Sequence, residues 1–354
     1  MRFKFSLRLA ALAACLFLLS GCAEIPTPQP TSAPAAISPA GETLEVHFID
    51  VGQADSALLL CGGQAMLIDG GNAQDSSLVV SYLEKLEVSH LDYVVCTHAH
   101  EDHVGGLSGP LNTCTATSVL SPSSQYESKA FESFVKYTQA QGLFPRRPAP
   151  DETFSLGGAT VTVLGPRLDY EQVNDTSIVL RVVFGETSFL FTGDMERTAE
   201  ADLLEAGCPL ASTVLKVGHH GSATSTSYPF LREVMPQYAV ISVGLDNPYG
   251  HPSQEVLSRL YDAGAQVYRT DLLGSVTAVS DGQEIVFTTE RPGQPDAGRD
   301  QAGSGQTAYI GNKNSHVFHL DTCANLPAAK NQVLFDSREQ ALSAGYRPCG
   351  GCAP

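Results

Sequence analysis

Short runs of hydrophobic residues alternate along the chain with stretches in which hydrophobic positions recur at helical spacing. The short runs predict β-strands at residues 44–50, 57–60, 65–69, 93–97, 160–164, 177–184, 188–192, 213–217, 239–243, 266–268 and 284–288. The helical spacing predicts helices at residues 76–86, 196–206, 229–234 and 254–263. Strands interleaved with helices favour an α/β fold in which two mixed sheets pack together and the helices lie outside.

The N-terminal 22 residues have the pattern of an export signal. Basic side chains precede an apolar run at residues 9–19, which is too short to span a bilayer comfortably. The run ends in Leu-Ser-Gly-Cys, which resembles a bacterial lipobox, so we expect Cys22 to be lipidated; an ordinary signal peptide or a buried hydrophobic start is the alternative. Residues 23–42, rich in Pro, Ala, Thr and Ser, predict a flexible tether. We therefore expect an extracytoplasmic lipoprotein that is anchored to the membrane.

The acidic charge of the chain limits the partners that it can bind. The 21 Lys and Arg side chains and 38 Asp and Glu side chains give a formal net charge of −17. Residues 41–290 carry this excess, with 12 basic and 32 acidic side chains, whereas residues 307–354 are near neutral. This charge disfavours a broad basic face that grips DNA. Basic side chains that remain candidates for local contact with a polyanion are Arg146, Arg147, Arg167, Arg181, Lys216 and Arg269.

The strongest chemical signal lies where the strand predicted at residues 93–97 ends. Four metal-binding side chains follow within six residues: His98, His100, Asp102 and His103. Imidazole and carboxylate groups suit Zn, Mn or Fe, and this spacing on a loop behind a rigid strand lets them surround metal ions from two sides. A surface histidine cluster without a role is the alternative, but this combination at this spacing is rare by chance.

The motif resembles that of the metallo-β-lactamase superfamily, hydrolases with an αβ/βα sandwich, over roughly residues 43–290. The resemblance extends to Asp194, at the end of a predicted strand, and to the pair His219-His220. It implies two divalent metal ions, Zn or Mn, in a binuclear site. Site one would be formed by His98, His100 and Asp194, and site two by Asp102, His103, Asp194 and one of the paired histidines. We favour His220 as that ligand because it directly precedes the Gly-Ser turn, with His219 facing the substrate.

One ligand of the superfamily is missing. Its third histidine of site one should lie before Asp194, but no histidine occurs between His103 and His219. Asn174 occupies about the right place. Because an amide oxygen replaces imidazole poorly on Zn, we expect site one to be weak, filled only with substrate or better suited to Mn.

This departure is typical of one branch of the superfamily. The strings VHFIDVGQADS at residues 46–56, LIDGG at 67–71, the strand beside Asn174, HHGS at 219–222 and NPYGHP at 247–252 resemble the soluble hydrolase domain of ComEC, the DNA-uptake protein. The membrane channel of that protein has no counterpart in this sequence. We therefore do not expect the chain itself to import DNA.

Side chains near the motifs have alternative interpretations. Asp69 either orients a histidine from behind or caps the turn that follows it. His251 either contacts the substrate or packs at the start of a helix. Asp50 and Asp55 are expected to form turns rather than to bind metal.

The resemblance implies metal-dependent hydrolysis, in which two cations activate water and neutralise charge on a phosphoryl or carbonyl oxygen. The candidate catalytic residues are Asp102, His219, Asn174 and His251. The ComEC branch points to a phosphodiester substrate, with DNA as a candidate, and to nuclease-like activity outside the cell. One alternative is another hydrolase of this fold, acting on phosphocholine esters, lactones or, least of all, β-lactams. The other is a non-catalytic lipoprotein that binds DNA or the cell wall.

A second metal signature follows a polar linker predicted at residues 291–306. The ligand candidates in residues 307–354 are His319, Cys323, Cys349 and Cys352. Such a set suits a structural tetrahedral Zn, which a segment this short needs for stability. With YIGNKNS at 309–315 and GYRPC at 345–349, the segment resembles the zinc-binding module of the Ada DNA-repair protein. That module uses four cysteines to accept a methyl group, so we do not extend methyl transfer to this Cys3His set; a disulfide is the alternative to Zn.

Overall fold

The computed structural model describes residues 41–296 and, in the C-terminal part, 309–320, 323, 325–335, 338–350 and 352. The predicted signal, Cys22, nearly all of the predicted tether, and residues 297–306 of the predicted linker lie outside the described residues. No described helix is long and apolar enough to cross a membrane.

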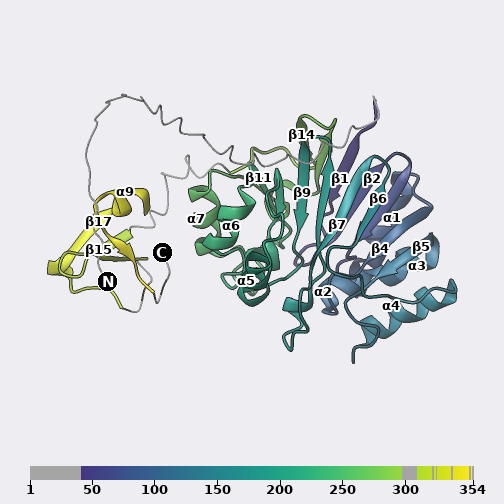
Figure 1. The fold of residues 1–354 in the computed structure, drawn as a ribbon, viewed down its shortest axis with the longest axis horizontal. Coiled ribbons are helices and arrows are strands. Elements are labelled where there is room, and N and C mark those ends of the chain that lie inside the picture. Colours follow the sequence, from purple (N-terminus) through teal and green to yellow (C-terminus); the bar gives the residue numbers. More distant parts are fainter. Residues whose placement is uncertain are drawn as a thin grey trace, which may run out of the picture. The chain divides into compact units, whose positions relative to one another are not determined.

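Two seven-stranded mixed sheets pack face to face within residues 41–296 (Figure 1). The first sheet has the order β14 (Ile285–Thr289), β13 (Val276–Ser280), β1 (Leu44–Phe48), β2 (Ala57–Cys61), β3 (Gln64–Ile68), β4 (His90–Val95) and β5 (Thr115–Leu120). The second has the order β12 (Gln266–Arg269), β11 (Tyr238–Ile241), β10 (Val214–Lys216), β9 (Thr187–Phe191), β8 (Val179–Phe184), β7 (Ala159–Gly165) and β6 (Thr153–Leu156).

Helices cover the outer face of each sheet (Figure 1). Those on the first sheet are α1 (Ser76–Lys85), α3 (Ser108–Thr113) and α4 (Lys129–Ala140), and those on the second are α5 (Arg197–Glu205), α6 (Tyr228–Val234) and α7 (Gln254–Asp262). The short helices α2 (Glu101–Val104) and α8 (Thr270–Leu273) follow β4 and β12. The layers are therefore helix, sheet, sheet, helix, which confirms the predicted αβ/βα sandwich.

The layer between the sheets is an apolar, buried cluster. Phe48 of β1 and Phe191 of β9 stack across it with ring centroids 5.9 Å apart. Two further apolar clusters fill the spaces between each sheet and its helices. This packing fixes the strand ends, which carry the candidate site.

Several elements are absent from the sequence prediction. Strand β5 begins with polar residues and β6 is a short edge strand, so neither has a clear hydrophobic pattern. Helix α4 does carry a signal: the Ser128 hydroxyl accepts from the Phe131 N–H as an N-cap, and Phe131 and Phe134 lie on one buried face. Strand β13 has buried positions at alternate residues, the period expected of a half-buried strand.

The start of the predicted linker contacts the sandwich. Arg291 pairs with Asp50 at 2.8 Å, and the Asp296 N–H donates to the Val267 carbonyl at 2.8 Å. The chain therefore stays in contact with the sandwich as far as residue 296, inside the predicted linker.

The C-terminal part forms a small sheet of its own. Its order is β17 (Gln332–Phe335), β15 (Tyr309–Asn312), β16 (Val317–His319) and β18 (Arg347–Pro348), with helix α9 (Arg338–Ser343) between β17 and β18 in sequence. Phe318 is fully buried at the centre of its core, which contains few other apolar side chains. A core this small needs an additional source of stability.

The Phe48→Ala variant should lower the free energy of unfolding by about 3–5 kcal/mol, because it leaves a cavity between the sheets. Phe144, which is 71% exposed, provides a matched control, and Phe144→Ala should change stability by about 0.5 kcal/mol or less. Urea denaturation measures both. Equal effects of the two substitutions would contradict the assignment of the core.

Candidate metal centre

Three strand ends bring the predicted ligands together. The segment from His98 to His103 follows β4 and begins α2, Asp194 follows β9, and the His219-His220 pair follows β10. Strands β9 and β10 are parallel, so their carboxyl ends open at the same edge of the second sheet. The first sheet packs against the second and brings its histidine segment to that edge.

Asp194 lies at the centre of this cluster and is only 2% exposed. Its oxygens face four imidazoles. The distances to their Nε2 atoms are 3.2 Å for His103, 3.7 Å for His219, 3.7 Å for His220 and 3.9 Å for His98. The Asp194 N–H donates to the Ser177 hydroxyl, which fixes the backbone that carries the carboxylate.

The ligand atoms of predicted site two are already close together. Those of Asp102, His103, Asp194 and His220 all lie within 4.8 Å of one another. His103 Nε2 and Asp194 Oδ1 face each other at 3.2 Å, and both are buried without a hydrogen-bond partner among the described residues. His220 Nε2 faces Asp102 Oδ2 at 3.3 Å. Two ligands about 2.1 Å from one tetrahedral ion lie ~3.4 Å apart, so these separations fit a metal ion.

Predicted site one is less complete. His98 Nε2 and His100 Nδ1 are 3.1 Å apart, which also fits two ligands of one ion. Asn174 instead contacts Glu196: its Nδ2 donates to Glu196 Oε1 at 3.2 Å, and its Oδ1 is buried without a partner among the described residues. The structure therefore places Asn174 beside Glu196.

Asp69 orients His103 from behind, which is the first of its two predicted interpretations. Its carboxylate lies 2.8 Å from His103 Nδ1 and accepts from the Thr97 N–H and hydroxyl at 2.7 and 2.6 Å. A proton held on Nδ1 leaves the Nε2 lone pair directed at Asp194. The approach of the Asp69 loop depends on glycine, because a Cβ at Gly106 would overlap the carbonyl oxygen of Gly70.

Asp55 was expected to form a turn, but the structure places it behind His220. Its side chain is 3.3 Å from His220 Nδ1, which also lies 3.0 Å from the Ser242 carbonyl. The other Asp55 oxygen pairs with buried Lys216 at 2.7 Å. Lys216, a predicted candidate for polyanion contact, is therefore occupied inside the fold. Two acceptors behind Nδ1 again direct the Nε2 lone pair of His220 forward.

His219 and His220 both adopt left-handed backbone conformations, with φ of 51° and 52°. This conformation costs a non-glycine residue about 1–2 kcal/mol. Consecutive residues of this kind persist only where surrounding contacts hold them. The His219 N–H donates to the Gly193 carbonyl, which ties this turn to the backbone before Asp194.

The centre is buried on one side and open on the other. His98, His103 and His220 are almost fully buried, whereas the side chains of Asp102 and His219 are 32% and 23% exposed. The His251 ring lies beside His219 with centroids 5.7 Å apart and is half-buried. A substrate would approach from this open side.

Carboxylates determine the charge of the cluster. Burial favours the neutral form of His220, but Asp194, Asp55 and Asp102 outweigh it and raise the pKa of His220 to about 10. The same balance raises the pKa of His103 well above its usual value. Burial alone would raise the pKa of Asp194, but the neighbouring imidazoles hold it well below the usual range. A bound cation displaces protons from these imidazoles, so metal affinity should rise with pH.

The arginines predicted as candidates for polyanion contact are also occupied. Four of them form ion pairs with carboxylates: Arg146–Glu152, Arg147–Asp169, Arg167–Asp151 and Arg269–Asp271. Arg181 donates to the Ala211 carbonyl. Each of these five arginines is therefore already engaged by a group of the protein.

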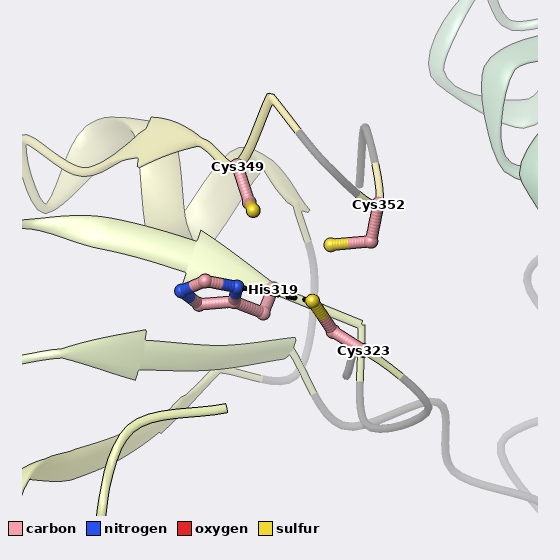
Figure 2. A group of neighbouring side chains, drawn as sticks. All are labelled: His319, Cys323, Cys349 and Cys352. Atoms are coloured by element: carbon pink, nitrogen blue, oxygen red, sulfur yellow. Dashed lines mark hydrogen bonds between the residues drawn. The ribbon is translucent and has the colours of Figure 1, made fainter. Parts of the chain in front are cut away.

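The C-terminal ligand candidates also converge (Figure 2). His319, Cys323, Cys349 and Cys352 each offer an atom within 4.8 Å of the others, and Figure 2 shows the three sulfur atoms directed toward a common point. His319 Nδ1 lies 3.3 Å from Cys323 Sγ. Three thiolates and one imidazole at these separations fit a tetrahedral zinc ion.

Glu196 is a functional candidate that the sequence prediction omits. It lies two residues after Asp194, and its Oε1 is 3.2 Å from His219 Nδ1. An acidic residue at this spacing, just before the helix that begins at Arg197, is the signal that could have identified it.

A sandwich of this kind with a histidine and aspartate cluster at its strand ends defines a metal-dependent hydrolase. Residues 49–244 match the metallo-beta-lactamase superfamily, and the chain belongs to this family. Residues 297–354 match the metal binding domain of Ada. Both predicted family resemblances are confirmed.

Curated relatives include three bacterial proteins. ComE operon protein 3 of Bacillus subtilis (strain 168) is 28% identical, with 66% of this chain and 32% of that protein covered. Competence protein ComA of Neisseria gonorrhoeae is 32% identical, with 64% and 31% covered. Recombination protein 2 of Haemophilus influenzae is 31% identical, with 66% and 28% covered. The chain thus spans about a third of the length of the curated relatives that it matches.

The Asp69→Asn variant should weaken metal binding by about 10–100-fold, because His103 loses the carboxylate that fixes its tautomer and orientation. Competition with a chromophoric chelator measures the affinity. Asp169→Asn, at a side chain that is 89% exposed, is the control and should bind as the wild type does. Unchanged affinity in Asp69→Asn would contradict the orienting role.

The Cys323→Ser variant should lose one zinc equivalent per chain, because it removes one of the four C-terminal ligands. Elemental analysis of the purified chain counts the zinc. Cys208→Ser, at a thiol outside both clusters, should retain the wild-type content. Identical zinc content in the two variants would exclude this zinc site.

Proposed function

We propose that this protein is a phosphodiesterase that holds two divalent metal ions around Asp194. The observation that carries the proposal is the orientation of the histidines. In His103 and His220, an acceptor behind the ring holds the Nδ1 proton, and the Nε2 lone pair faces a carboxylate oxygen. In the metal-free protein, the raised pKa values of these histidines keep a proton between Nε2 and the carboxylate oxygen, and a bound metal ion would take the place of that proton.

Two bound cations would supply an activated water and neutralise charge on a phosphoryl oxygen. The residues of this chain prepare the site for that chemistry. Asp194 holds the histidine clusters of the two sheets at a common point. Asp69 keeps His103 in the binding tautomer, and the Ser242 carbonyl, with Asp55 beside it, does the same for His220. Asp102 and His251 lie toward the open side, where we expect His251 to contact a substrate oxygen.

DNA is the proposed substrate class, supported by the competence and recombination proteins among the relatives. Because the chain spans only about a third of their length, DNA uptake itself is not extended to it. The paired arginines and the acidic charge favour a substrate that is recognised at the cleaved phosphate rather than along a backbone. The same charge also keeps a second candidate open, a hydrolase of small esters such as phosphocholine esters or lactones.

We also propose that Cys22 is lipidated and anchors the protein outside the cytoplasm. The support is the basic start, short apolar run and Leu-Ser-Gly-Cys sequence of residues 1–22. Mass spectrometry of the mature N-terminus should find a diacylglycerol-modified Cys22. An unmodified N-terminus at another residue would reject the anchor.

Purified chain carrying Cys22→Ser should cleave end-labelled DNA when Mn²⁺ or Zn²⁺ is present and stop when EDTA is added. His103→Ala should reduce the rate by at least about 100-fold, because this ligand cannot be replaced by its neighbours. His90→Ala, at an exposed histidine of β4 outside the site, is the matched control and should retain the wild-type rate. Comparison of single- and double-stranded DNA gives the strand preference.

The alternatives give different results in the same assay. Metal-dependent cleavage of a phosphocholine ester or lactone without cleavage of DNA would make that small ester, rather than DNA, the substrate. Bound metal without turnover of any ester, together with unchanged DNA binding in the metal-free protein, would favour a non-catalytic binding protein.

A further inference from the structure

We infer that His219 is the third histidine ligand of metal site one, with Glu196 as its supporting carboxylate. The inference rests on the proposed binuclear site and assigns the ligand that the sequence lacks between His103 and Asp194. It changes the predicted role of His219, which the sequence places toward the substrate.

The surroundings of His219 repeat those of the site-two histidines. Its Nδ1 lies 3.2 Å from Glu196 Oε1, so the proton belongs on this nitrogen. Its Nε2 lies 3.7 Å from Asp194 Oδ2, the same distance as His220 Nε2. His219 therefore presents a lone pair to the central carboxylate, as His103 and His220 do.

Glu196 is held in place by more than the histidine. The same Oε1 accepts from the Thr224 hydroxyl at 3.0 Å and from Asn174 Nδ2 at 3.2 Å. The backbone N–H of Glu196 donates to Asp175 at 2.9 Å. A carboxylate fixed by these donors can orient an imidazole rather than follow it.

The contact with Asn174 assigns His219 to site one. Asn174 occupies about the sequence position where the superfamily has its third histidine of that site, and here it donates to Glu196, which contacts His219. Two other imidazoles lie near the same Asp194 oxygen. His220 Nε2, 3.7 Å away, also faces Asp102 of site two, whereas His98 Nε2, 3.9 Å away, contacts His100 of site one. Site one would thus contain His98, His100, His219 and Asp194.

The backbone supports the same assignment. Left-handed conformations at both His219 and His220 let adjacent side chains reach one carboxylate, where an extended backbone would direct them to opposite faces. The conformation is tied down by the His219 N–H, which donates to the Gly193 carbonyl. Strain at two consecutive residues is explained if both side chains bind metal.

The test titrates Mn²⁺ into the full chain with its C-terminal zinc site loaded, and follows free Mn²⁺ and Mn–Mn coupling by electron paramagnetic resonance. The wild type should bind two Mn²⁺ ions. His219→Ala should keep one ion and lose the coupled signal. Its affinity for the second ion should fall by more than the factor of about 10–100 that follows the loss of a supporting group. Glu196→Gln should retain both ions but weaken the second by about 10–100-fold.

His90→Ala is the matched control, and thermal denaturation shows whether each variant folds. Where His219→Ala does not fold, Glu196→Gln carries the test, because it keeps the size of the side chain. Wild-type affinity for both ions in His219→Ala, or in Glu196→Gln, would overturn the inference. Loss of the second ion in Asn174→Ala but not in His219→Ala would make Asn174 the ligand instead.

The readout separates this inference from the proposed activity. Two bound ions, sensitive to His219 as expected, without cleavage of any phosphodiester would reject the activity and keep the ligand. Phosphodiester cleavage by a protein whose metal binding is unchanged in His219→Ala would keep the activity and reject His219 as a ligand.

Discussion

The whole centre depends on one buried carboxylate. Asp194 is 2% exposed between two sheets, and a buried charge is tolerated only where opposite charges or donors surround it. Four imidazole nitrogens within 3.9 Å provide those surroundings. Because they come from loops after β4 and β10, the two sheets have to pack in one register for the cluster to form.

A second ring of acidic groups orients those imidazoles for binding a cation. Asp69 lies behind His103, Asp55 behind His220, and Glu196 behind His219. Each favours a proton on the rear nitrogen, which in His220 is hydrogen-bonded to the Ser242 carbonyl, and so directs the front nitrogen toward the centre. Lys216 neutralises Asp55 inside the fold, which limits the accumulated negative charge. The cluster is thus organised to bind cations. This arrangement requires the strained turn at His219 and the close approach of Gly70 to Gly106.

Much of this could be predicted from the sequence, because the ligands follow a motif and lie at strand ends. The packed sheets and the C-terminal Cys3His cluster follow from local patterns, and the central role of Asp194 follows from the resemblance to the metallo-β-lactamase superfamily. Contacts between distant segments do not: nothing near Asp55 indicates that it reaches Lys216, and nothing in Asn174 indicates that it holds Glu196. Strands β5 and β6 were missed because edge strands with polar residues have little hydrophobic alternation. Two adjacent histidines also cannot be told apart by sequence, since their roles depend on an unusual backbone conformation.

The family and the site together support hydrolysis, and the centre is open toward Asp102 and His251, where a substrate can enter. The central claim is that Asp194 lies between two metal ions. The most direct test is a crystal structure of the Mn²⁺-loaded protein with anomalous diffraction. We expect two manganese peaks flanking Asp194, about 3.5–4 Å apart, as in two-metal hydrolases. A single peak at the Asp102, His103 and His220 side, or none, would contradict the binuclear centre.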